Sequence, residues 1–284
     1  MKTKKNNICS PLNIDSFTCF SKKALIKISR SWNNYHKDKK IEFNDNYSKY
    51  KLWSLLNEKL KEKCTNDYCW TKQRFISPIS KKMKGKYFRP KMPKEWYKDP
   101  REWLNTEDIE NVLNQYNKKY KDFLFIGAVP LDFDHRFSPG ECVINELCNI
   151  NIKQLLKRGK KRIAVVFNLD NHDQEGSHWV SFFGDFDKEK LYFFDSYGYE
   201  EPDEVRVLVD RLIKQGKKLG KNITFERNKH RNQFKKSECG TYSIYFIEQL
   251  LKNSSNSKRL FNNIVKDDDM LKNRNRYYIH KKNI

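Results

Sequence analysis

Four short apolar segments in the middle of the chain constrain its fold more than any other feature. Residues 123–133, 162–169, 178–186 and 190–198 are rich in aromatic and branched side chains and are bounded by Asp, Gly, Asn or Pro, a pattern typical of β-strands. A further strand is predicted at residues 222–228. The chain is therefore expected to contain a β-sheet.

Amphipathic segments flank these strands and predict helices. Apolar side chains recur at helical spacing in residues 48–64, 106–120, 204–220 and 239–253. Thr106 opens the second of these segments and is followed by acidic residues, which favour the N-terminus of a helix. Strands and helices together predict an α+β fold.

The first third of the chain differs from the rest. Residues 1–95 are rich in Lys and Asn and are expected to form a basic, mainly helical N-terminal extension. Prolines at positions 90, 93 and 100 discourage regular structure and indicate a boundary there. A core of the size of an enzyme domain is expected over residues 96–284.

The seven cysteines are odd in number and irregularly spaced. This argues against a disulfide framework of the secreted type, so reduced thiols are expected, and at least one thiol stays free if all the others pair. Cys64 and Cys69 lie close in sequence but lack a second pair with a suitably placed histidine. No structural metal is predicted, and no organic cofactor.

No stretch of the chain approaches the roughly 20 apolar residues that a membrane-spanning helix requires. The first residues, MKTKKNNICSPLNID, also lack the apolar stretch of a secretory signal. No membrane span is therefore predicted, and the protein is expected to stay inside a cell.

The chain is strongly basic, with 58 Lys and Arg against 36 Asp and Glu and a net charge of +22. Such a charge favours association with DNA or another polyanion. An AT-rich coding sequence also enriches lysine without selection for a partner. Both interpretations stay open.

Two adjacent predicted strands place a histidine near a carboxylate. A turn at residues 185–189 would join the strands into an antiparallel hairpin. His178, at the start of one strand, would then lie near Asp195, at the end of the next. A carboxylate bonded to one ring nitrogen fixes the imidazole tautomer and leaves the other nitrogen for a nucleophile.

Cys239 is the candidate nucleophile. It lies where KKSECG gives way to a predicted helix, and a helix N-terminus favours a thiolate. Its neighbour Gly240 would permit close approach of a substrate. His178, Asp195 and Cys239 together predict a thiol hydrolase. The alternative is a strand-end histidine, a turn residue and a small buried hydrophobe.

Four other side chains of interest receive no role. His172 and His230 lack a carboxylate partner at the right place in the sequence and are interpreted as loop histidines. Cys142 and Cys148 remain unassigned.

The order HW, then FFDSYG, then a glutamine before CG resembles the cysteine proteases that include the SUMO-specific proteases and the adenovirus maturation protease. In that family the glutamine donates to the oxyanion, and Gln233 lies six positions before Cys239. The resemblance implies that His178 is the base and Asp195 its orienting carboxylate. It covers roughly residues 96–284 and implies a central mixed β-sheet flanked by helices.

The segment REWLNTEDIENVL also resembles the opening of SUMO-protease catalytic domains. This implies that Trp103 and Trp179 line a narrow passage for the residues before the scissile bond, although both could instead be core aromatics. Two flat aromatic walls leave no room for a side chain. A protein substrate with a Gly-Gly-X-type site, cleaved after glycine, is therefore expected.

The helical extension, the AT-rich composition and the ending DDDMLKNRNRYYIHKK resemble polyprotein-processing proteases of large nucleocytoplasmic DNA viruses. The favoured function is therefore cleavage of viral precursors during virion maturation, in the virion and the virus factories of the host cytoplasm. One alternative is an isopeptidase that removes SUMO or ubiquitin from host conjugates. Another is a non-catalytic, nucleic-acid-binding virion protein. The sequence gives no indication of the oligomeric state.

Overall fold

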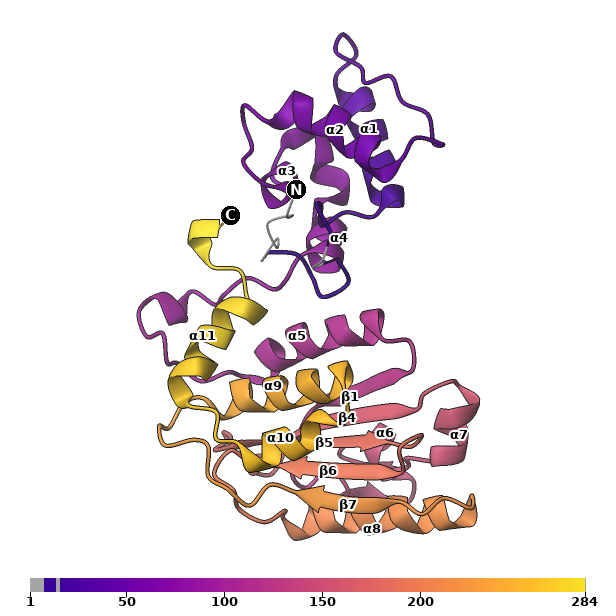
Figure 1. Cartoon of the computed structure of the whole chain (residues 1–284), viewed down its shortest axis with the longest axis vertical. Coiled ribbons are helices and arrows are strands. Elements are labelled where there is room, and N and C mark those ends of the chain that lie inside the picture. Colours follow the sequence, from indigo (N-terminus) through magenta and orange to yellow (C-terminus); the bar gives the residue numbers. More distant parts are fainter. Residues whose placement is uncertain (1–7, 14–15, 284) are drawn as a thin grey trace. The chain divides into compact units, whose positions relative to one another are not determined.

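A computed structural model describes residues 8–13 and 16–283 and divides the chain into two compact units (Figure 1). The helical unit comprises residues 1–93 with 275–284, and the sheet unit comprises residues 94–274. The sequence placed the boundary after residue 95 and assigned the C-terminal segment to the core. That segment joins the helical unit because Ile279 forms backbone hydrogen bonds with Pro90 and Met92.

A five-stranded mixed sheet, in the order β1-β4-β5-β6-β7, forms the centre of the sheet unit. The strands are β1 (Phe123–Pro130), β4 (Arg162–Asn168), β5 (Trp179–Asp185), β6 (Lys190–Phe194) and β7 (Thr224–Arg227). β1 pairs parallel with β4, β5 pairs antiparallel with both of its neighbours, and β6 pairs parallel with β7. The five predicted strands and the mixed sheet are confirmed.

Each face of the sheet is covered by different helices, because side chains alternate along the strands. Val180 and Phe182 of β5 pack in one core with α8 (Asp203–Lys218). The helices α5 (Thr106–Lys119) and α9 (Cys239–Lys252) lie on the opposite side of the strands (Figure 1). These three helices match predicted segments, and the α+β class is confirmed.

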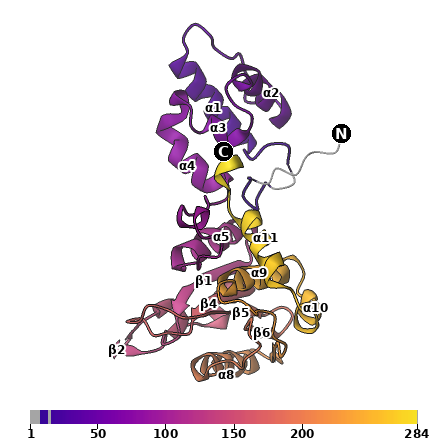
Figure 2. The same cartoon turned by 90° about the vertical axis from the view of Figure 1, so that its left-hand side faces the viewer.

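Smaller elements complete the sheet unit. The hairpin formed by β2 (Arg136–Ser138) and β3 (Glu141–Cys142) extends away from the five-stranded sheet (Figure 2). These elements are η2 (Glu95–Tyr97), β2 (Arg136–Ser138), β3 (Glu141–Cys142), α6 (Asn145–Cys148), α7 (Ile152–Lys157), α10 (Asn256–Asn262) and α11 (Asp267–Tyr277), whose last residues belong to the helical unit.

The outer edge of β1 is capped by side chains of α5. Asn117 accepts the backbone N–H of Phe125 at 2.6 Å, and Glu110 accepts the N–H of Ala128 at 3.4 Å. Backbone groups of an edge strand can otherwise pair with a strand of another molecule. These contacts therefore protect this edge of the sheet.

The helical unit has a hydrophobic core of its own, which the sequence did not predict. Buried Leu25, Leu56 and Trp70 are among the side chains that form it. The predicted helix at residues 48–64 is confirmed as α2 (Lys49–Leu60). The elements are α1 (Lys22–Tyr35), α2 (Lys49–Leu60), α3 (Asp67–Trp70), η1 (Arg74–Ile76), α4 (Ser77–Tyr87) and η3 (Lys281–Asn283).

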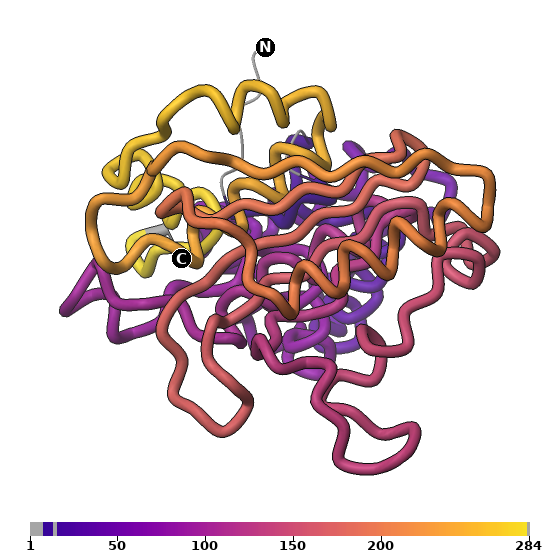
Figure 3. The backbone as a smooth tube through the Cα atoms, turned by 90° about the horizontal axis from the view of Figure 1, so that it is seen from below, coloured from indigo at the N-terminus to yellow at the C-terminus, as the bar shows by residue number. Residues whose placement is uncertain are grey.

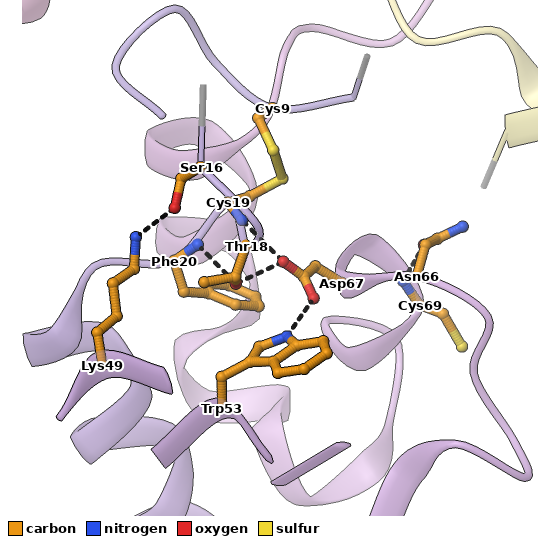
Figure 4. The surroundings of a disulfide bond; sticks show 10 residues. All are labelled: Cys9, Ser16, Thr18, Cys19, Phe20, Lys49, Trp53, Asn66, Asp67 and Cys69. Carbon is orange, nitrogen blue, oxygen red and sulfur yellow. Dashed lines mark hydrogen bonds between the residues drawn. A yellow bond between two sulfur atoms is a disulfide. The ribbon is translucent and has the colours of Figure 1, made fainter. Parts of the chain in front are cut away.

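Asp67 is a buried carboxylate that joins three segments of the helical unit (Figure 4). It accepts hydrogen bonds from the Thr18 hydroxyl at 2.6 Å, the Cys19 N–H at 2.8 Å and the Trp53 indole at 3.2 Å. Burial raises the pKa of this carboxyl, and the hydrogen bonds act in the opposite direction.

Six of the seven cysteines form disulfides, and Cys239 is free. The expectation of reduced thiols is therefore wrong. Each pair is separated by ten or fewer positions, so local folding is enough to bring the two sulfurs together. The Cys9–Cys19 disulfide is shown in Figure 4. The pairs are Cys9–Cys19, Cys64–Cys69 and Cys142–Cys148.

Two features are absent from residues 8–13 and 16–283. Neither unit contains, within these residues, a helix both long and apolar enough to span a membrane. In the same part of the chain, no group of three or more His, Cys, Asp or Glu residues is arranged to hold a metal ion.

Candidate active site

One edge of the sheet brings the candidate residues together. β1, β4, β6 and β7 run in one direction and β5 in the other, so four strand ends meet the beginning of β5. His178 immediately precedes β5, and Asp195 immediately follows β6. The long loop that leads from β4 to His178 projects from the sheet in Figure 3.

The predicted hairpin brings His178 and Asp195 into contact. β5 and β6 pair with Ser181 opposite Phe194, which sets the two residues at adjoining strand ends. The His178 Nε2 and the Asp195 Oδ1 are 2.7 Å apart, and both residues are buried. Because the carboxylate occupies Nε2, the second ring nitrogen, Nδ1, is left for another partner.

Backbone and amide groups hold the Asp195 carboxylate and its segment in place. The N–H of Tyr197 donates to Oδ1 at 2.9 Å, and the N–H of Tyr199 donates to Oδ2 at 3.3 Å. The side chain of buried Asn228 accepts from the Asp195 N–H at 3.0 Å and donates to its carbonyl at 2.6 Å. Asn228 was not predicted as a site residue, although it is the last residue of the strand predicted at residues 222–228 and directly follows β7.

Cys239 is the first residue of α9 and is 2% exposed. Its side chain interacts with the His178 imidazole and helps to raise the imidazole pKa. The first N–H groups of a helix lack intrahelical partners, so they create positive partial charge at this sulfur. The structure therefore brings together His178, Asp195 and Cys239, as the sequence predicted.

The charge state of His178 follows from these contacts. Burial lowers the pKa of the imidazole, but the hydrogen bonds to Asp195 and Cys239 and the charges of both groups outweigh it and raise the pKa to about 9. An imidazolium is therefore the favoured form at neutral pH. This is the form that can give a proton to a leaving group.

Tyr197 covers one face of the candidate base. Its ring and that of His178 have centroids 4.6 Å apart and planes inclined by 25°. The turn that follows requires Gly198, which has a φ of +80°. A Cβ there would lie 2.8 Å from the backbone carbon of His230, so the turn packs directly against the loop before α9.

Gln233 is fully buried in the loop before α9, and its amide contacts the segment that follows Asp195. Its Oε1 accepts from the Ser196 hydroxyl at 2.7 Å. Its Nε2 donates to the Lys235 carbonyl at 2.6 Å and to the Tyr197 hydroxyl at 3.4 Å. The amide N–H₂ therefore has one short and one long contact within the protein.

Trp179 and Gly240 pack closely at the start of α9. The Trp179 indole is buried and donates to the Leu104 carbonyl at 2.8 Å. A Cβ on Gly240 would lie 3.0 Å from the Leu104 Cβ and 3.4 Å from Trp179 Cδ1. Gly240 was expected to permit close approach of a substrate. Leu104 occupies that space instead. Trp103 is 41% exposed and precedes Leu104 in the chain.

A buried ion network, which the sequence analysis missed, lies directly before the nucleophile. The Glu238 carboxylate is fully buried and pairs with Arg274 and Arg101 at 3.2 and 3.1 Å. Arg274 also donates to the carbonyls of Glu102 and Ser237, at 2.6 and 3.1 Å. Burial raises the pKa of Glu238, and the two arginines oppose this. The network ties the segment before Cys239 to α11.

Of the two histidines without an assigned role, His172 has a carboxylate partner after all. Its ring Nδ1 lies 2.6 Å from the Asp132 Oδ2, and its backbone N–H donates to the other oxygen of the same carboxylate. The loop after β1, which contains Asp132, and the loop after β4 leave the same edge of the sheet, a proximity that local sequence does not reveal. His230 lies in the exposed part of the loop before α9.

Known proteins provide independent comparisons. Residues 150–283 match the family described as adenovirus endoprotease. A mimivirus (Acanthamoeba polyphaga mimivirus) protein named as a thiol protease is 32% identical over 275 residues, which cover 91% of this chain and 87% of the relative. A cysteine protease of African swine fever virus (strain Badajoz 1971 Vero-adapted) is 28% identical over 179 residues, or 60% of this chain and 65% of that protein.

The fold also matches a solved structure. The crystal structure of the ASFV protease superimposes with a TM-score of 0.66 at 19% identity and covers 98% of this chain and 97% of that one. Both units therefore have counterparts in a known fold. The chain belongs to the family of thiol proteases that includes the mimivirus protein, and it is a cysteine protease.

Proposed function

We propose that Cys239, His178, Asp195 and Gln233 carry out the peptide hydrolysis of this cysteine protease. The observation that carries the proposal is the buried His178, which lies 2.7 Å from Asp195 and also interacts with Cys239. This arrangement supplies an activated nucleophile, a proton carrier and an orienting carboxylate in one place.

In the first half of the reaction, His178 holds the proton of Cys239, and the thiolate attacks the carbonyl carbon before the scissile bond. A C–S bond forms as the carbonyl electron pair moves to oxygen. The tetrahedral intermediate collapses, the C–N bond breaks, and the imidazolium gives its proton to the leaving amine. In the second half, His178 takes a proton from water, which attacks the thioester and releases the Cys239 thiolate.

Gln233 and the backbone N–H of Cys239 are proposed to stabilise the oxyanion. The amide of Gln233 donates at 3.4 Å to the Tyr197 hydroxyl, a long contact that it could exchange for an oxyanion. Its shorter bonds, to Ser196 and Lys235, would hold the amide in place. The exchange would therefore require no reorientation of the side chain.

The proposed substrates are viral precursor polyproteins cleaved after glycine, at Gly-Gly-X-type sites, during virion maturation in virions and virus factories. Trp179 and Leu104 fill the space beside Gly240, next to Cys239, and leave little room for a substrate side chain there, which supports a preference for glycine. The viral relatives support the setting. Trp103, adjacent to Leu104 and partly exposed, is proposed to form the other wall of the narrow passage for the substrate.

Labelling with a Gly-Gly-based electrophile, followed by mass spectrometry, tests the proposed chemistry. Cys239 should be modified in the native chain, and the modification should be strongly reduced in His178→Ala. Cys239→Ala should be folded and inactive towards a Gly-Gly-X peptide. Substantial cleavage by purified Cys239→Ala would reject the assignment of the nucleophile.

An isopeptidase that removes SUMO from conjugates is the second candidate function. It is supported by the name of a relative, because an African swine fever virus protein 28% identical over 179 residues is named a SUMO-1 cysteine protease. An isopeptidase recognises a folded modifier, whereas a precursor protease needs only an extended segment. Cleavage rates for a short Gly-Gly-X peptide and for a SUMO fusion should separate the two functions. A strong preference for the fusion would favour deconjugation.

DNA or another polyanion remains a proposed partner, supported by the net charge of +22. A polyanion could concentrate a basic protease and basic precursors together. Cleavage that is insensitive to salt and to added DNA would argue against this partner.

A further inference from the structure

Arg231 differs from most arginines of the sheet unit in its partners. It is exposed, and its Nε donates to the Gln233 carbonyl at 2.7 Å. Among the described residues, no carboxylate pairs with its guanidinium. In the same unit six arginines form ion pairs with carboxylates: Arg101, Arg162, Arg206, Arg211, Arg227 and Arg274.

Two aromatic rings hold this guanidinium. Its central carbon lies 5.1 Å from the centroid of the Tyr197 ring and 5.1 Å from that of Phe234. Cation–π contacts stabilise an arginine in one position without using its N–H donors. Because Nε is bonded to Gln233, the two Nη groups are left to bind another acceptor. A side chain held in this way loses little entropy when it binds a ligand.

The guanidinium also lies close to the reacting groups. The Tyr197 ring that it contacts is stacked on His178 at 4.6 Å. Both distances end at the same ring centroid, so the guanidinium carbon is at most about 10 Å from the imidazole, or about three residues of an extended chain.

We propose that Arg231 is a specificity-determining residue that binds a carboxylate of the substrate, within about three residues of the scissile bond. A guanidinium fork matches the two oxygens of a carboxylate, and charged hydrogen bonds of this kind are stronger than neutral ones. Exposed Lys229 and Lys236 in the same loop add positive potential. The inference rests on the proposed function for the identity of the scissile bond.

A positional scan of peptides tests the proposal. A neutral Gly-Gly peptide is compared with variants that carry a single Asp at each flanking position in turn. At one position, within about three residues of the scissile bond, Asp should raise kcat/KM by about fivefold over the neutral peptide, the size expected for an exposed ion pair. Asp at the other positions should have a smaller effect.

Three variants distinguish bidentate binding by the Arg231 guanidinium from an effect of positive charge alone. Arg231→Gln should abolish the preference for Asp, so that the ratio of kcat/KM for the Asp peptide to kcat/KM for the neutral peptide falls to about one. Arg231→Lys keeps the charge but loses the fork and should retain only part of the preference. Lys236→Gln removes a positive charge from the same loop and should retain all of it.

Binding to the full-length Cys239→Ser chain, measured by anisotropy of rhodamine-labelled peptides, distinguishes failure of this inference from failure of the proposed function. Tighter binding of the Asp peptide that depends on Arg231, with no cleavage by the native chain, would reject the cleavage site and keep the carboxylate site. Cleavage of all peptides at equal rates would overturn the role of Arg231, as would an equal loss of preference in Lys236→Gln.

Discussion

The ring of Tyr197 lies against the imidazole of His178, with centroids 4.6 Å apart and planes inclined by 25°. The backbone N–H of Tyr197 also donates to the Asp195 carboxylate at 2.9 Å. One residue therefore contacts both the candidate base and its orienting carboxylate. It follows Asp195 by two positions in the FFDSYG motif.

Removing the Tyr197 ring is expected to lower kcat while leaving KM for a neutral Gly-Gly peptide nearly unchanged. A stacked aromatic pair contributes about 0.5–1.5 kcal/mol, so Tyr197→Ala should reduce kcat by about two- to tenfold. Tyr197→Phe keeps the stack and loses only the 3.4 Å contact to Gln233. It should therefore stay within about twofold of the native chain. Equal effects of the two variants would contradict a positioning role for the ring.

The pH profile of cleavage should fall on its alkaline side near pH 9. Although burial lowers it, the pKa of His178 is raised to about 9 by hydrogen bonds and charges of Asp195 and Cys239. Above that pH the imidazole no longer carries the proton that the leaving amine needs. Asp195→Asn removes one of the raising interactions, so its alkaline limb should lie at lower pH. An unchanged limb in this variant would show that another group titrates.

The same shift has a consequence for stability. Because the folded-state pKa lies above the ordinary value of 6.5, His178 stabilises the fold fully below about pH 6.5, and this contribution is lost as pH rises through about 9. The free energy of unfolding of His178→Gln should therefore depend less on pH over that interval. Urea denaturation at several pH values measures the difference.

Arg274→Met is expected to destabilise the sheet unit strongly and to reduce activity. The change takes a partner from the fully buried Glu238 carboxylate and frees the carbonyls of Glu102 and Ser237. Breaking a buried ion pair on one side costs about 3–5 kcal/mol. Thermal unfolding should show a large loss in Tm. The exposed pair Arg30–Asp45 provides the control, because Arg30→Met should cost at most about 1 kcal/mol.

A single thiol should react when the native chain is denatured without a reductant. The structure pairs six cysteines and leaves Cys239 free. Alkylation followed by mass spectrometry counts the reactive thiols, with a reduced sample as the control. The Cys9→Ser/Cys19→Ser double variant should lower the stability of the helical unit by about 2–3 kcal/mol, the loop-entropy contribution of a short loop. Seven reactive thiols in the unreduced sample would reject all three bridges.

Local patterns in the sequence were sufficient for most of the sheet unit. Alternating and continuous apolar segments predicted all five strands of the sheet, and helical spacing predicted α5, α8 and α9. The hairpin between β5 and β6 connects neighbours in the chain, so the proximity of His178 and Asp195 followed from a single short turn. The helix predicted at residues 239–253 likewise placed the candidate nucleophile Cys239 at a helix N-terminus. These inferences succeeded because each depends on residues close together in sequence.

Tertiary structure decided what depends on distant segments. Asn228 reaches Asp195, Arg274 reaches Glu238, and the loop before α9 brings Arg231 to Tyr197. Each of these contacts joins residues more than 30 positions apart, where local periodicity carries no information about which side chains meet. The disulfides differ, because they join near neighbours and were missed for lack of knowledge of the backbone geometry that brings two sulfurs together. The sequence by itself thus determined the candidate triad, and folding determined the surroundings that hold and tune it.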